Sequence, residues 1–345
     1  MDRLVQKFLF LIIFSVLACN PTNKNQDTDR ALRDKKLNKK AKNHQYSNDK
    51  PSEKGEYSIL SYNLFGGICL NNDNSLFSRL LKNIDIFFTQ ESVDINTLFH
   101  LSKAIPTGYG PETVSVYLAH TIEHKPFKGE KISTQSTTAE IPDRHAIVAD
   151  LDGLKIANLH LSGGRYDDNF IAKNIDNQQQ INAYIKYKTQ LLNDVIKKNP
   201  DIILGDFNSV YASDPTLKQS FYDSQFNYFA NNQFIKHPLN DAQKEVILKL
   251  NQSPYDLLSA MGYFYAQPQN EKSAITNCRG LSIIDSIWYK KDRVELKDVE
   301  IVEIFQNKQR CSAPFCPLGG NPTTGGLSDH NPIRAKVSKI AKLPK

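Results

Sequence analysis

Cysteine is scarce in this sequence of 345 residues: there are five, and no two of them form a Cys-x-x-Cys pair. A structural zinc site is therefore disfavoured. Internal repeats are absent. The apolar run nearest the amino terminus, residues 8–18, is too short for a membrane-spanning helix, which needs about 20 apolar residues.

The larger part of the chain lacks net charge. Of the 43 Lys and Arg and the 37 Asp and Glu residues, 12 and 6 lie in residues 1–55, which leaves 31 of each kind for residues 56–345. The formal charge of +6 thus belongs to the first 55 residues. A neutral domain lacks the broad basic surface of a tight, non-specific duplex binder, although a locally positive groove is compatible with it.

Residues 1–19 have the pattern of a secretory signal peptide. Arg3 and Lys7 precede the apolar run, and the following Val16-Leu17-Ala18-Cys19 resembles a bacterial lipobox, in which the cysteine carries the lipid. We therefore expect lipidation of Cys19 and a secreted or cell-envelope location, as an outer-membrane lipoprotein. The alternative is a plain secretory signal with a chance cysteine.

Residues 20–55 are rich in Lys, Asn, Asp and Ser and predict a disordered basic tether. Residues 56–345 have the length of one large domain. Its four cysteines permit two disulfides in an oxidising compartment, with three connectivities open. A local bridge between Cys311 and Cys316 would leave Cys69 with Cys278.

Apolar runs that end in polar residues recur through the domain and predict buried strands. The ranges are 57–63, 84–91, 113–119, 146–150, 154–161, 202–206, 282–289 and 333–337. Residues 76–83 predict a short helix, and residues 181–196 predict an amphipathic helix that ends before Asn199-Pro200. These elements predict an α/β sandwich with two packed mixed β-sheets flanked by helices and a site at one edge.

The stretch at 211–270 predicts a helical insertion. It is dense in aromatic residues, which we interpret as core packing rather than as a surface on which bases stack.

Polar residues gather at the ends of the predicted strands. Gly205 allows a close approach of the backbone, and strand alternation predicts Asp206 and Asn208 on the same side. The full set is Asn63, Glu91, His160, Asp206, Asn208, Asp285, Asp329 and His330. Such a set offers carboxylates for a hard cation, amides for phosphate oxygens and two histidines for proton transfer, the requirements of phosphoester hydrolysis.

Six blocks of the sequence resemble the endonuclease/exonuclease/phosphatase superfamily and follow its order. They are SYNLFGG with Asn63, FFTQES with Glu91, NLHLSGG with His160, GDFNS at 205–209, IIDSIWY with Asp285, and Ser328-Asp329-His330. The resemblance covers residues 57–337. It implies a four-layer α/β sandwich and hydrolysis of phosphoesters with Mg²⁺, or Mn²⁺ as the alternative ion.

The resemblance also implies roles around the metal and the attacking water. Glu91 would bind Mg²⁺ with help from Asn63, and Asp329 would contribute to the metal shell. Asp206 and Asn208 would position or activate the water and hold the phosphate.

A second group would handle protons and phosphate charge. His330, oriented by Asp285, would act as base or stabilise the phosphorane. His160 matches the general acid of the deoxyribonuclease I-like branch, and Arg144 resembles that branch's phosphate-contacting arginine. Glu112 is the candidate carboxylate partner of His160.

Three departures from the family pattern concern the substrate. Ile283 stands where an arginine often precedes the strand aspartate, and Phe65 stands where abasic-site endonucleases carry an acid, which argues against base-excision repair. The insertion at 211–270 and the loop at 306–326 match no known block of the family.

We expect a monomeric, secreted or envelope-tethered nuclease that hydrolyses phosphodiesters of DNA or RNA. The reasons are His160 and Arg144, the deoxyribonuclease-like spacing of the blocks, and Arg165 in the Ser-Gly-Gly-Arg loop. The alternative is a phosphoinositide phosphatase or sphingomyelinase-like phosphoesterase acting on phospholipid headgroups, favoured by the neutral domain and the lipid anchor. A non-catalytic binding protein is the third interpretation, and the complete set of blocks disfavours it.

Overall fold

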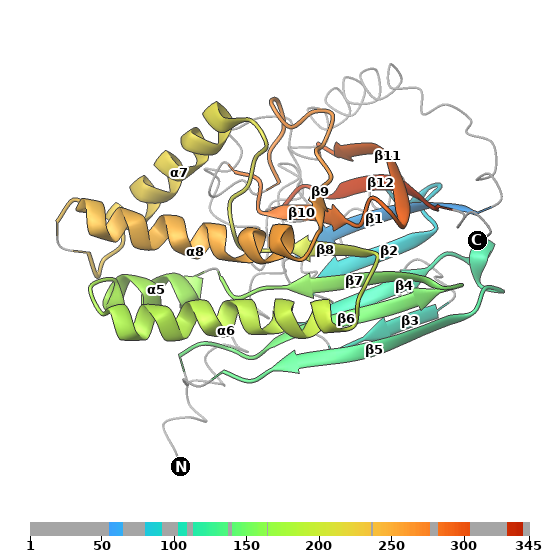
Figure 1. Cartoon of the computed structure of the whole chain (residues 1–345), viewed down its shortest axis with the longest axis horizontal. Coiled ribbons are helices and arrows are strands. Elements are labelled where there is room, and N and C mark those ends of the chain that lie inside the picture. Colours follow the sequence, from blue (N-terminus) through green and yellow to red (C-terminus); the bar gives the residue numbers. More distant parts are fainter. Residues whose placement is uncertain are drawn as a thin grey trace, which may run out of the picture.

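The computed structural model describes residues 55–64, 80–91, 103–108, 113–136, 140–163, 165–235, 237–276, 282–303 and 330–340, without the side chains of residues 103, 120, 165 and 166. Within these residues, twelve strands form two six-stranded mixed sheets, here called sheet A and sheet B (Figure 1). Sheet A has the order β11 (Val294–Ile301), β12 (Ile333–Lys339), β1 (Glu56–Asn63), β2 (Ile86–Gln90), β4 (Val114–Leu118) and β3 (Lys103–Pro106). Sheet B has the order β5 (Phe127–Thr134), β6 (Arg144–Leu151), β7 (Leu154–His160), β8 (Ile202–Asp206), β10 (Asp285–Tyr289) and β9 (Phe264–Tyr265).

Apolar side chains fill the space between the two sheets. Ile59 and Phe88 of sheet A belong to the same buried cluster as Ile156, Leu204 and Ile287 of sheet B. Strand β2 is buried along its whole length, as expected when both faces of a sheet are covered. The outer face of sheet A packs against the segment at residues 80–84. The fold class predicted from the sequence, an α/β sandwich of two packed mixed sheets with helices outside, is therefore confirmed.

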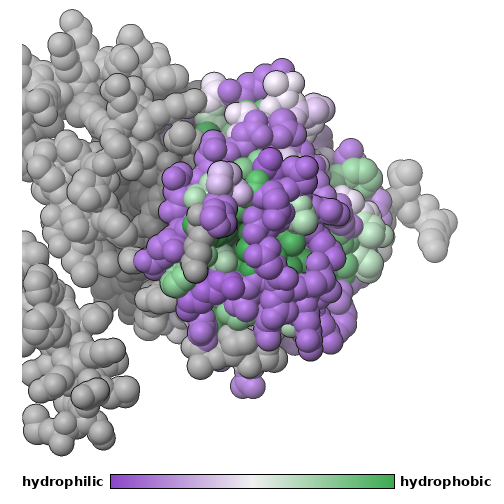
Figure 2. Space-filling view, turned by 90° about the vertical axis from the view of Figure 1, so that its left-hand side faces the viewer, coloured by the Kyte–Doolittle hydropathy of each residue, from purple (hydrophilic) through white to green (hydrophobic). Residues whose placement is uncertain are grey.

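Four helices form a layer beside the outer face of sheet B (Figure 1). They are α5 (Arg165–Asn174), α6 (Gln178–Lys197), α7 (Pro215–Ala230) and α8 (Asp241–Ala260). Helix α6 contributes Leu191 and Leu192, and α8 contributes Leu258, to a cluster with Ile203 and Trp288 of the sheet. The outer end of this layer, at the left of Figure 1, is mostly hydrophilic with a smaller hydrophobic area (Figure 2).

The helices begin and end where the sequence provides caps. The side chain of Asn177 accepts a hydrogen bond from the amide of Gln180 at the start of α6, and the predicted helix at 181–196 lies inside this element. After α6, Asn199 adopts a left-handed conformation (φ 54°) before Pro200. No helix among the described ranges is long and apolar enough to cross a membrane.

The aromatic insertion largely packs inward, as predicted. Five of its aromatic side chains are at most 5% exposed: Phe221, Tyr222, Phe229, Tyr255 and Tyr263. Three are exposed by 39–45%: Tyr228, Phe234 and Phe264. The five cysteines lie outside the described residues.

The two sheets are joined by polar side chains as well as by apolar packing. The Gln90 amide donates to Oδ1 of Asn158 over 2.6 Å, and Nδ2 of Asn158 donates to the carbonyls of Thr89 and Ser115 over 2.9 Å each. Asn158 belongs to sheet B and its three partners to sheet A. These bonds fix how one sheet lies on the other, directly below the site.

Candidate active site

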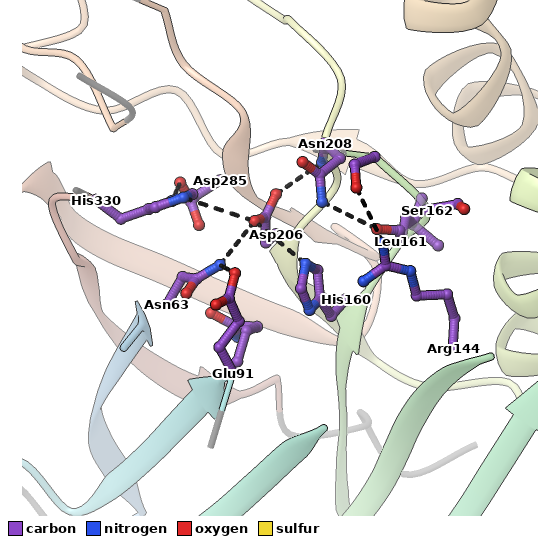
Figure 3. A network of polar contacts seen from close by, with 12 residues as sticks. Asn63, Glu91, Arg144, His160, Leu161, Ser162, Asp206, Asn208, Asp285 and His330 are labelled. Atoms are coloured by element: carbon purple, nitrogen blue, oxygen red, sulfur yellow. Dashed lines mark hydrogen bonds and ion pairs between the residues drawn. The ribbon is translucent and has the colours of Figure 1, made fainter. Parts of the chain in front are cut away.

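Several of the strand-end residues singled out in the sequence meet at one edge of the two sheets (Figure 3). In sheet B, His160 on β7 is paired with Asp206 on β8, and Asp206 with Asp285 on β10. Residues directly opposite one another point to the same face, so these three form one row. In sheet A, the parallel strands β1 and β2 end at Asn63 and one residue before Glu91. The row in sheet B therefore faces Asn63 and Glu91 of sheet A across the gap between the two sheets.

Gly205 makes room for this row. Its φ is +132°, and a Cβ atom built on it would lie 2.0 Å from the carbonyl oxygen of Leu159 in β7. The close backbone approach predicted for this glycine is confirmed, and its partner is the neighbouring strand.

Asn208 reaches the site by a route other than strand alternation. Strand β8 ends at Asp206, and Asn208 adopts a left-handed conformation with φ 45°. Its backbone amide donates to Oδ1 of Asp206 over 2.7 Å, and its side-chain amide donates to the carbonyl of Leu161 over 3.0 Å. The predicted proximity of Asp206 and Asn208 is correct, whereas the predicted reason is wrong, because a turn closed by the Asp206 carboxylate carries Asn208 there.

Asp206 lies at the centre of the site and is 1% exposed. The amide of Asn63 donates to its Oδ2 over 2.9 Å. Nε2 of His160 lies 3.6 Å and Nε2 of His330 lies 3.9 Å from the same oxygen. Burial, and then the negative charge of Asp285, raise the pKa of Asp206 to about 6, against the lowering effects of His330 and the two amide donors.

His330 and Asp285 form a buried pair. Nδ1 of His330 lies 2.8 Å from Oδ2 of Asp285, and both residues are at most 4% exposed. When the neutral imidazole donates its Nδ1 proton to this carboxylate, Nε2 faces Asp206 as an acceptor. The resemblance to the superfamily implied this pair, in which Asp285 orients His330.

The donor set at the site fits a hard divalent cation. Carboxylate oxygens of Asp206 and Asp285 and a ring nitrogen of His330 lie within 4.8 Å of one another, all buried. The same Asn63 amide that donates to Asp206 also donates to Oε1 of Glu91 over 3.1 Å. Clustered carboxylates with amide groups are typical ligands of Mg²⁺, and a cation would neutralise the charges that Asp206 and Asp285 bring together.

Arg144 lies under the segment that follows β7 and is 4% exposed. Its Nη2 donates to the carbonyl of Gly163 over 2.9 Å and lies 3.6 Å from Oδ2 of Asp167. In the described structure this arginine therefore holds the Leu161–Gly163 segment beside Asn208.

Sequence reasoning missed a buried polar network behind the site. Asp167, at the start of α5, accepts hydrogen bonds from Ser162 over 2.5 Å and from Tyr184 over 2.9 Å. Lys188 of α6 donates to the carbonyl of Asn208 over 2.6 Å. A signal for Lys188 was present in the sequence, because it occupies an apolar position of the amphipathic helix at 181–196.

Some predicted site residues lie outside the described residues. These are Asp329, Glu112, the lipidation candidate Cys19, and the side chain of Arg165, whose backbone begins α5.

No protein-family model matches the chain, and no curated protein matches its sequence. Solved structures do match. Truncated TDP2 from Caenorhabditis elegans is 18% identical, with 82% of this chain and 97% of that chain covered and a TM-score of 0.43. The 3'-5' exonuclease NExo from Neisseria meningitidis is 16% identical, with 81% and 98% covered and a TM-score of 0.45.

The 2',3'-cyclic phosphatase ANGEL2 is 14% identical, with 84% of this chain and 97% of that chain covered and a TM-score of 0.46. At such identities and scores the likeness concerns the fold, and function has to be argued from the residues of the site. The chain is thus similar to these three solved structures at low identity, while its six sequence blocks resemble the endonuclease/exonuclease/phosphatase superfamily.

Proposed function

We propose that this chain is a divalent-metal-dependent phosphodiesterase that acts as a nuclease on DNA or RNA. One observation carries the proposal. The Asn63 amide joins Glu91, a carboxylate suited to a cation, to Asp206, a buried carboxylate flanked by two histidines. The groups proposed for metal ligation, water activation and proton transfer therefore lie next to one another, joined by the Asn63 side chain.

In this proposal Glu91 and Asn63, together with Asp329, hold Mg²⁺ or Mn²⁺. The bound cation supplies Lewis-acid polarisation of a phosphoryl oxygen and neutralises its charge. Asn208 and Arg144 orient the phosphate, and Arg165, at the first position of α5, is the third candidate to contact it. Because Arg144 is buried and donates to the Gly163 carbonyl, it acts in this proposal through the Gly163 segment rather than from an exposed position.

Proton transfers fall to the buried row. With a pKa of about 6, Asp206 is ionised at neutral pH and is close enough to that range to accept the proton of the attacking water. His160 presents Nε2 beside Asp206 and donates a proton to the departing oxygen. His330, held through Nδ1 by Asp285, presents Nε2 to the same place, and in its protonated form it donates from Nε2 and stabilises the negative charge of the transition state.

A phospholipid phosphoesterase is the second candidate. The neutral balance of residues 56–345 and the predicted anchor at Cys19 favour it. In both cases we propose a location outside the cytoplasm, which the signal-peptide pattern of residues 1–19 supports.

The test compares substrates with the full-length chain in Mg²⁺, in Mn²⁺ and in EDTA. Plasmid DNA, single-stranded DNA and RNA form one arm, and phosphoinositide and sphingomyelin vesicles form the other. Cation-dependent cleavage of nucleic acid that is lost in Asp206→Asn, and kept in the exposed control Asp223→Asn of α7, supports the nuclease. Headgroup or phosphate release with intact nucleic acid moves the assignment to lipids, and inactivity in both arms refutes the proposal.

A further inference from the structure

Lys188 is a buried cation on the side of α6 that faces sheet B. It is 4% exposed, and its neighbours on this side of the helix are apolar, including Leu191, Leu192 and Val195. Its ammonium nitrogen donates to the carbonyl oxygen of Asn208 over 2.6 Å, and within the described ranges it makes no other hydrogen bond. A long cationic side chain thus crosses an apolar interface to reach one backbone atom of the candidate active site.

That backbone atom belongs to the residue whose conformation the site depends on. Asn208 has φ 45°, a conformation that side-chain-bearing residues adopt infrequently, and three hydrogen bonds hold it. Its amide donates to Asp206, its side chain donates to Leu161, and its carbonyl accepts from Lys188. The side-chain amide has a second hydrogen, which this geometry leaves for a phosphate oxygen.

The surroundings of Lys188 are charged on several elements. Asp167 and Asp168 of α5 and Asp206 of β8 attract its positive charge, and Arg144 of β6 repels it. None of these groups lies within ion-pair distance of its nitrogen. Burial outweighs the three carboxylates and lowers the pKa of Lys188 to about 8.

A buried ammonium without a close counter-ion weakens the folded state. An unbranched apolar side chain such as Met would fill the same space without that desolvation cost. The position therefore gains little for stability from being lysine, and the bond to Asn208 is what the ammonium provides.

We propose that Lys188 is a positioning residue: through the Asn208 carbonyl it holds the Asn208 backbone against Asp206 and so keeps the Asn208 side-chain amide in place for contact with the reacting phosphate. The expected effect of Lys188 on turnover rests on the proposed phosphodiesterase function. The inference distinguishes Lys188 from a lysine that merely supports the helix, because stability and turnover should respond to its replacement in different ways.

The test compares Lys188→Met, Lys188→Gln and Lys186→Met, the last a matched change at an exposed position of α6. Turnover is measured on bis(4-nitrophenyl) phosphate and on single-stranded DNA with Mn²⁺, and the melting temperature of each variant is recorded. We expect kcat to fall about tenfold or more in Lys188→Met with KM changed less than about threefold, because the amide acts on the transition state. Lys188→Gln keeps a donor and should lose less, and Lys186→Met should match the wild type.

The melting temperature separates positioning from support of the fold. It should stay level or rise in Lys188→Met. A wild-type kcat in that variant overturns the inference. The inference is also overturned if both Lys188 variants lose turnover and the melting temperature of both falls by more than about 10 °C.

Crystal structures of the wild type and Lys188→Met supply a readout that needs no activity. We expect Asn208 to leave its left-handed conformation, its backbone amide to lose the hydrogen bond to Asp206, and its side chain to lose the hydrogen bond to the Leu161 carbonyl. An unmoved Asn208 overturns the inference. A wild-type protein that cleaves neither substrate refutes the proposed function alone, and the Asn208 conformation then decides on Lys188.

Discussion

Gly163 contacts Asn208 so closely that no side chain fits between them. A Cβ atom on Gly163 would lie 2.1 Å from the Asn208 Cβ and 2.4 Å from its Cγ. The carbonyl of Gly163 is held by Arg144, so the segment has little freedom to withdraw. Gly163 packs against the Asn208 side chain and Lys188 binds the Asn208 carbonyl, so both residues limit the movement of Asn208.

Gly163→Ala should for this reason damage the site more than the fold. We expect a loss of about 1–3 kcal/mol in the free energy of unfolding from overpacking, and at least a tenfold fall in phosphodiester turnover because Asn208 has to move. Urea melts and initial rates measure the two quantities. Gly108→Ala is the control, since the nearest atom to its Cβ is the Thr113 methyl group at 3.3 Å, at the end of a side chain. Unchanged turnover in Gly163→Ala would contradict the role of this contact.

The depressed pKa of Lys188 predicts a pH-dependent stability difference. Below about pH 8 the lysine is protonated in the folded and unfolded states, so the full cost of its burial is present. Between about pH 8 and the unfolded value of 10.5, the folded state loses the proton first, and the wild type gains stability relative to Lys188→Met. From pH 7 to 9.5 we expect a relative gain of about 2 kcal/mol.

Urea melts at these two pH values test it, with Lys186→Met as the control that follows the wild type. The charged groups facing Lys188, namely Asp167, Asp168, Asp206 and Arg144, are the same in all three proteins, so their titration largely cancels. A constant difference between the wild type and Lys188→Met would show that Lys188 keeps an ordinary pKa in the fold.

At the scale of elements, the sequence predicted the inner strands and missed the edges. The eight predicted strands correspond to β1, β2, β4, β6, β7, β8, β10 and β12, which lie inside the sheets. The four strands missed, β3, β5, β9 and β11, are the four edges. Inner strands such as β2 and β8 are buried along their whole length and form apolar runs, whereas β5 exposes most of the residues of FKGEKIST.

The residues of the candidate site also divide into those that the sequence predicted and those that it missed. Strand ends made Asn63, His160, Asp206, Asp285 and His330 recognisable, because an apolar run stops at or near each of them. Asp167 and Lys188 act from helices, and their contacts depend on how α5 and α6 pack against the sheet. A local pattern shows that a buried lysine is unusual, but only the packed structure shows which atom it reaches.

Asn158 couples the sheets that carry the two halves of the site. Asn158→Ala would leave the carbonyls of Thr89 and Ser115 and the amide of Gln90 without their buried partner. We expect a loss of about 2–4 kcal/mol in the free energy of unfolding and a fall in turnover, since Glu91 and Asp206 lie on different sheets. Equilibrium urea unfolding measures the first. Thr189→Ala, on a part-buried hydroxyl that bonds only within α6, is the control, and equal losses in both variants would refute the coupling.

At the scale of the whole molecule, the site exists only when the two sheets are packed. Its described members run from Asn63 to His330 and come from strands of both sheets. A cation held across this gap would bind the folded chain and not the unfolded one, so binding should raise the stability of the entire domain.

Mg²⁺ should accordingly raise the melting temperature, with a gain of about 2.7 kcal/mol at a hundredfold excess over the dissociation constant. For a domain of this size that amounts to about 5 °C. In Glu91→Gln the shift should disappear while the metal-free melting temperature stays close to the wild type, because Glu91 is only partly buried and lies at a strand end. Glu245→Gln, an exposed position on α8, should keep the full shift. Because the measurement needs no substrate, an undiminished shift in Glu91→Gln would remove Glu91 from the metal site and leave the buried Asp206, Asp285 and His330 group as the place where the cation binds.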